Sequence, residues 1–227
     1  MPEVNHISPD VDTGKVLDEI ERAVYLAIKS CGFRKHGRIL HRFVSEDISQ
    51  VIHFQTGQAH LGESHLLFVN LGIRIPECVL RRFSKEKDLK KYYQEYECNI
   101  RSRLGVVEGK EEACYDLYGD PAEITADILR QVVEVVLPVF EELNSRDAIL
   151  SRRRSYPQFD RINDHLILLE EAMIYGCRGE MQKARDAFRQ HYHMFETGQT
   201  TQKNISAIRN HLNYLDGLAA TLGIRMQ

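Results

Sequence analysis

The sequence predicts an α+β protein, with an antiparallel sheet of about five strands, helices packed on one face, and a C-terminal three-helix segment. Three observations lead to this prediction. An amphipathic helical pattern covers residues 12–31, strand-like runs follow it, and helical periodicity returns from residue 120 onward. Short links between most of the runs favour antiparallel pairing, and consecutive strands flanked by helices favour a sheet with helices on one face.

The first half of the chain alternates between one helix and several strand-like runs. Apolar residues recur at three- and four-residue steps over residues 12–31, and Gly32 provides a C-terminal stop. In the strand-like run at residues 65–75 the odd-numbered positions are apolar, and Pro76 ends this run. The first two runs indicate a hairpin, and the last two are expected to pair. The predicted strands are 39–44, 48–55, 65–75, 98–107 and 113–118.

The second half of the chain is predicted to be helical. An Asp-Pro-Ala-Glu sequence at 120–123 combines an N-cap, a first-position proline and a third-position glutamate, and the helix it begins should kink near Pro138. Three amphipathic helices follow a basic, proline-containing segment. We therefore expect an α+β domain in residues 1–150 and a C-terminal helical module in residues 151–227.

Composition narrows the class of protein. Hydrophobic residues make up 43% and charged residues 28%, as in globular proteins. No apolar stretch approaches the roughly 20 residues of a membrane helix, and the N-terminus lacks a secretory pattern. Five widely spaced cysteines without a C-x-x-C pair favour a reducing cytoplasm. The net charge of −3 gives no strong attraction to nucleic acid, so neither a membrane nor nucleic acid is expected as a partner.

The sequence offers no local signature of catalysis. The nucleophile elbow, the phosphate-binding loops and the H-E-x-x-H zinc motif are all missing, so we predict no catalytic residues and no cofactor, and we lean against an enzyme. His41 and His53 could share one face of the hairpin, but two histidines without a third ligand do not predict a metal site. His191 and His193 point in different directions on a helix.

Several short motifs resemble those of a known family. They are Gly-Phe-Arg-Lys-His-Gly at 32–37, Val-Ile-His-Phe-Gln at 51–55, Val-Asn-Leu-Gly at 69–72, Arg-Ser-Arg-Leu-Gly at 101–105 and Leu-Pro at 137–138. In this order they resemble the bacterial family known as domain of unknown function 4304, over roughly residues 13–145. The resemblance implies an α+β fold and a cytoplasmic bacterial origin, without an established activity or functional residues. Family members often carry a tryptophan near the fifth strand, where this chain has Tyr115 or Tyr118.

One set of polar residues suggests a binding surface. The set consists of three pairs, one on each of three predicted strands, and the two residues of a pair lie an even number of positions apart, so that they face the same side of the strand. The residues are Arg38, Arg42, Asn70, Arg74, Arg101 and Arg103. If these positions all face the side opposite the helices, the sheet presents an arginine-lined surface suited to carboxylate or phosphate. The alternative is an ordinary polar, solvent-facing side of an antiparallel sheet.

Three functions are left open by the sequence. The first is a non-catalytic interaction protein of adaptor or immunity type, with a protein partner or a second copy as homodimer. The second is binding of an anion or phosphate-containing small ligand through the arginine-lined sheet face, with or without catalysis. The third, nucleic-acid binding through Arg152–Arg154, is least favoured because no aromatic residues are interleaved with the basic run.

Overall fold

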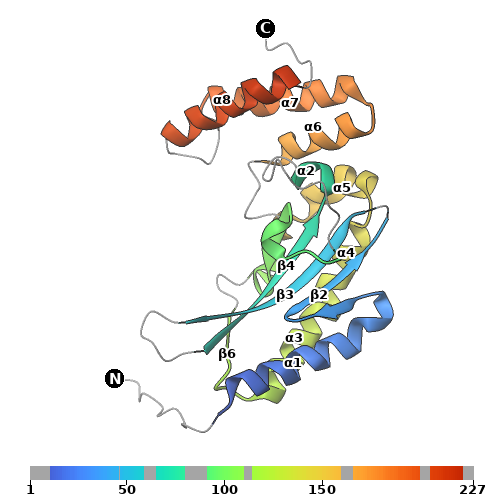
Figure 1. Ribbon diagram of the computed structural model, residues 1–227, viewed down its shortest axis with the longest axis vertical. Helices are drawn as coiled ribbons and strands as arrows, with labels where there is room; N and C mark the ends of the chain where they lie inside the picture. Colours follow the sequence, from blue (N-terminus) through green and yellow to red (C-terminus); the bar gives the residue numbers. More distant parts are fainter. Residues whose placement is uncertain are drawn as a thin grey trace.

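The computed structural model describes residues 11–45, 47–58, 65–79, 91–109, 114–159, 166–199 and 205–221. Figure 1 shows a twisted sheet with helices along one side and the last three helices stacked beyond one end of the sheet. The predicted α+β class, with an antiparallel sheet, is confirmed.

The first helix is placed as its periodicity predicts. Helix α1 spans Thr13–Ile28 and continues as a 3₁₀ turn, η1, at Lys29–Cys31. The Asp12 carboxylate caps it by accepting a hydrogen bond from the Lys15 backbone N–H at 3.1 Å. Gly32 ends it with a φ of 89°, a left-handed conformation that costs glycine little.

All strand pairs are antiparallel. The order is β1-β2-β3-β4-β5, with β6 beside β4. Strand β5 pairs only with positions 70–73 of β4, so the first half of that edge is left for β6. The sequence predicts that the last two strands pair with each other. Instead, β5 and β6 both pair with β4, one after the other along the same edge. The strands are β1 (Arg34–His36), β2 (Ile39–Phe43), β3 (Ser49–Gln58), β4 (His65–Arg74), β5 (Ile100–Arg103) and β6 (Tyr115–Asp116).

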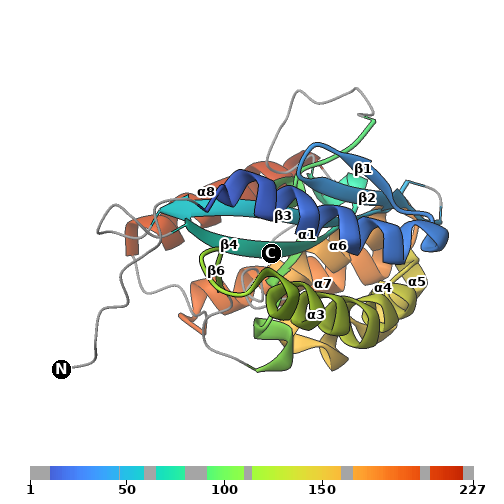
Figure 2. The same cartoon turned by 90° about the horizontal axis from the view of Figure 1, so that it is seen from below.

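One face of the sheet carries the main hydrophobic core. Alternate residues such as Leu40, Ile52 and Leu71 pack there against α1 and the long helix that follows the sheet. That helix consists of α3 (Pro121–Gln131), a π-helical turn η4 (Val132–Val136) and α4 (Leu137–Glu142). The π turn lies immediately before Pro138, where the predicted irregularity falls, because proline lacks the N–H that an α-helix needs there. Figure 2 shows α1 and α3 running along the sheet.

Short helices lie between the strands and between the long helix and the C-terminal helices. They are α2 (Pro76–Val79), η2 (Glu95–Glu97), η3 (Val106–Glu108), α5 (Arg146–Arg152), η5 (Arg153–Ser155) and η6 (Pro157–Phe159). The last three helices are α6 (Ile167–Cys177), α7 (Met181–Glu196) and α8 (Ile205–Thr221). In the described part of the chain no helix is long and apolar enough to cross a membrane.

The opposite face of the sheet is partly covered by the segment from residue 91 to residue 98. Tyr92 and Cys98 pack there against Ile39 and Val51. A Cβ atom at Gly72 would lie 2.6 Å from the Cys98 sulfur, so this close approach requires glycine. The covering segment brings charged and aromatic side chains onto a face that sequence alone assigns to solvent.

A buried ion pair joins helix α6 to the turn η5 that follows α5. Arg153 Nη1 lies 2.7 Å from Glu170 Oε2, and the two side chains are 1% and 2% exposed. Helix α5 runs through position 150, where the chain was expected to divide, and Phe159 and Ile174 belong to the main core. The division into two domains stays a prediction.

Replacing Arg153 with methionine should destabilise the protein by about 3–5 kcal/mol, because Glu170 would be left buried without its counter-ion. Urea denaturation measures this change. The matched control is Arg152→Met, which breaks the exposed ion pair between Arg152 and Glu142 and should cost less than about 1 kcal/mol. Equal losses in the two variants would show that the buried pair holds α6 to η5 no more strongly than an exposed pair would.

Candidate functional site

A pocket of about 210 Å³ lies at the free edge of β2. Strand β1 ends its pairing at Arg34, which is opposite His41, so the last residues of β2 have no strand on that side. The left-handed turn at Gly32 leads the chain from α1 into β1 and forms one wall of the pocket. The remaining described lining residues are Arg34, His41, Arg42, Phe43 and Lys91.

The pocket is strongly cationic. Three of the six described lining residues are arginine or lysine, a fourth is histidine, and none of the six is acidic. Arg34 and Lys91 are exposed, and neither forms an ion pair with an acid of the described chain. Two cations held at one small opening without a counter-ion attract an anion.

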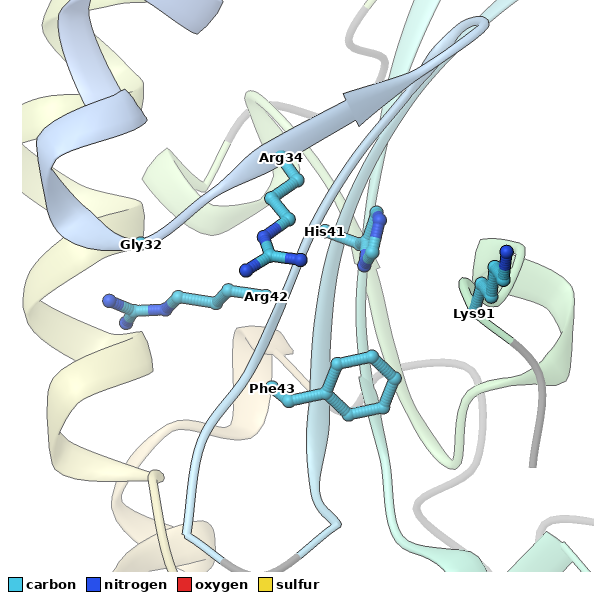
Figure 3. A pocket seen from close by; sticks show the side chains of 6 residues that line it. All are labelled: Gly32, Arg34, His41, Arg42, Phe43 and Lys91. Carbon is cyan, nitrogen blue, oxygen red and sulfur yellow. The ribbon is translucent and has the colours of Figure 1, made fainter.

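Figure 3 shows that Arg42 differs from the other cations. It extends toward α4, whereas His41 and Phe43 lie on the opposite side of β2. The Arg42 Nε donates to Gln50 Oε1 at 2.7 Å, its Nη1 donates to the Cys31 carbonyl at 2.8 Å, and its Nη2 lies 2.7 Å from Glu141 Oε1. Its charge is therefore already neutralised, and it fixes the position of β2 against the helices.

The imidazole of His41 is largely buried at the pocket wall. Burial lowers the pKa of His41, and the nearby His36 and Arg34 lower it further. His41 is therefore neutral at pH 7, with one ring nitrogen able to donate a hydrogen bond and the other able to accept one. Its Nδ1 is buried without a hydrogen-bond partner among the described residues.

The predicted arginine face is only partly assembled. The β3–β4 and β4–β5 registers place Asn70, Arg74, Arg101 and Arg103 on the face opposite the main core. The prediction that Arg38 and Arg42 share this face is wrong. Arg42 has the same parity as Leu40 and therefore faces the helices, where Gln50 and Glu141 receive its guanidinium. Arg38 lies in the turn before β2.

Nearby groups of the protein already engage most of these side chains. Arg38 pairs with Asp18 and Glu21 on α1, at 2.9 and 2.7 Å. Arg101 Nε lies 2.6 Å from Glu95 Oε1. These pairs do not leave a continuous row of cations for a ligand. Whether the face binds an anion stays a prediction.

Two arginines of the face instead stack on aromatic rings. The Arg103 guanidinium lies 4.5 Å from the Phe68 ring centroid, and its Nε donates to Asn70 Oδ1 at 3.1 Å. The Arg74 guanidinium lies 3.8 Å from the Tyr93 centroid, and its Nε and Nη1 have no hydrogen-bond partner among the described residues. Arg74 is only 6% exposed, and its guanidinium is held between the sheet and the Tyr93 ring.

The sequence did not single out the residues of the pocket as a group. Arg34 lies on a three-residue strand that was not predicted, and Lys91 lies in a charged stretch without periodicity. The sequence pattern pairs His41 only with His53, as two of the ligands that a metal site would need. Among the described residues no group of three or more His, Cys, Asp or Glu side chains could hold a metal ion. The one available signal was the dense basic composition of residues 34–42.

Comparison with known proteins gives one match. No curated protein and no solved structure matches the chain. A family model described as Domain of unknown function (DUF4304) matches residues 25–142, which include the strands around the pocket and the helix α3–α4. The match covers the larger part of the region in which the sequence motifs resemble this family, and the chain therefore belongs to the DUF4304 family.

Proposed function

We propose that the protein binds a small anion, a carboxylate or a phosphate group, in the pocket at the free edge of β2. The observation that carries this proposal is that Arg34 and Lys91 line one pocket and that neither pairs with an acid within the described residues. Other arginines close by, such as Arg38 and Arg101, have carboxylate partners. A bound anion would supply the missing counter-charge.

The neutral imidazole of His41 fits the same role. It can donate one hydrogen bond to an oxyanion without adding a third positive charge to the free pocket. Once an anion is bound, its negative charge favours the protonated ring and raises the pKa of His41. Anion binding is therefore coupled to proton uptake at this residue.

The proposed role is binding rather than catalysis. The described lining residues supply cations, one imidazole and one aromatic ring, and none of them is a serine, cysteine or carboxylate nucleophile. A reaction at this pocket would need its nucleophile from the ligand or from water. We therefore propose a non-catalytic ligand-binding protein.

An adaptor or immunity-type function has less support from the geometry. The sequence favours it because catalytic motifs are missing, the resembled family has no known activity, and the last helices carry regular apolar stripes that form a partner surface if the chain itself does not bury them. Several of these residues instead pack on one another within the chain, and they are Leu169, Ala172, Ala187, Phe188 and Leu215. A protein partner or homodimer stays a prediction, which light scattering checks.

The proposed compartment is the cytoplasm of a bacterium. All five cysteines are free thiols, and burial raises the pKa of Cys98, which keeps that thiol protonated. Free thiols, two of them exposed, fit a reducing compartment. The bacterial origin rests on the family resemblance.

Replacing Arg34 or Lys91 with glutamine should weaken the binding of inorganic phosphate about tenfold each, because a charge-assisted hydrogen bond contributes roughly 1.5–3 kcal/mol. Isothermal titration calorimetry measures the dissociation constants. Arg22→Gln is the matched control, since it removes an exposed cation from α1 with the same change in net charge. If all three variants lose affinity equally, the attraction comes from overall charge and not from the pocket.

Lowering the pH from about 8 to about 5 should strengthen the binding of sulfate, whose own charge does not change over this range. The pKa of His41 is lowered in the free protein and is raised when sulfate binds. The affinity for sulfate therefore rises as the pH falls through the pKa of the bound protein, and it levels off below the pKa of the free protein. His41→Gln should flatten this dependence, and His36→Gln should retain most of it. An unchanged slope in His41→Gln would exclude the proton coupling.

A further inference from the structure

We infer that the anion bound by the pocket carries an aromatic ring, which packs against Phe43. This inference rests on the proposed function, because it names the class of ligand for the same pocket. Phe43 lines the pocket and is 45% exposed, while the apolar residues beside it on the same sheet face, Ile39 and Val51, are buried. An exposed phenylalanine next to uncompensated cations presents the two surfaces that an aromatic anion needs.

A row of rings crosses the sheet face beside the pocket. His36 stacks on Tyr92 with ring centroids 3.6 Å apart, and Tyr92 lies 6.2 Å from His41. His41 lies 6.0 Å from Phe43, and Phe43 lies 6.1 Å from Tyr93. Tyr93 and His41 are buried, so Phe43 is the ring of this row that combines a place in the pocket wall with a large exposed surface.

The neighbours of Phe43 fix its orientation before a ligand arrives. The interplanar angle is 85° with His41 and 75° with Tyr93, which are edge contacts on two sides. Tyr93 is itself held by the Arg74 guanidinium at 3.8 Å from its centroid. Because the ring is already ordered, stacking a ligand on it loses little conformational entropy.

The size of the pocket agrees with a small aromatic anion. Its volume of about 210 Å³ is below the range of roughly 300–1,000 Å³ that drug-sized ligands and cofactors occupy. One ring with one oxyanion group fits this scale. Arg34 and Lys91, which both line the pocket, would attract the oxyanion, and Phe43 would receive the ring.

Calorimetric titration of the full chain with two pairs of anions tests this inference. Inorganic phosphate is compared with phenyl phosphate, and acetate is compared with benzoate, so that both kinds of oxyanion are represented. We expect the aromatic member of at least one pair to bind about tenfold more tightly than its partner. In Phe43→Leu this ratio should fall to near one, and in Phe43→Tyr it should be retained. Tyr214→Leu, which removes an exposed ring from α8, should retain it as well.

The possible results separate the two proposals. A ratio near one in both pairs for the unmodified protein, with phosphate or acetate still bound, would overturn the aromatic ligand and leave anion binding standing. A high ratio that persists in Phe43→Leu would also overturn it, since the ring would then pack elsewhere. If none of the four anions binds, the proposed function fails and the inference fails with it.

Discussion

The ladder between β3 and β4 is the constraint on which the rest of the structure depends. Ten consecutive residue pairs, from Ser49 opposite Arg74 to Gln58 opposite His65, fix the register of the two longest strands. Because side chains alternate between the faces of a sheet, this register decides which residues enter the core and which face the covering segment. A shift by one residue would exchange the two sets.

The pocket follows from this alternation at the edge of the sheet. Along β2, Leu40 and Arg42 face the helices, and His41 and Phe43 face the other side. Arg42 is tolerated beneath the helices because Gln50 and Glu141 receive its guanidinium, and Gln50 in turn donates to the Phe140 carbonyl at 2.6 Å. Acids on α1 and α4 neutralise Arg38 and Arg42, whereas Arg34 and Lys91 of the pocket wall have no acidic partner among the described residues.

The helices and the longer strands could be predicted from local patterns, because their signals lie within the residues that form them. The first helix has an Asp12 cap and a Gly32 stop, and β4 shows a clean alternation. The arginine face could not be predicted, because Glu141, the carboxylate partner of Arg42, comes from a helix far along the chain and the cover of Arg74 comes from Tyr93. A three-residue strand such as β1 is too short to give a periodic signal, so the pocket beside it was missed.

The central claim is that this one pocket, and no other cationic surface, receives the anion. Chemical-shift changes in a ¹H–¹⁵N nuclear magnetic resonance titration with inorganic phosphate test it most directly, because they report every residue in one experiment. We predict that the largest saturable changes occur at Gly32, Arg34 and Lys91, together with the imidazole of His41. Changes concentrated at Arg152–Arg154, or small changes spread evenly over all exposed cations, would contradict the claim.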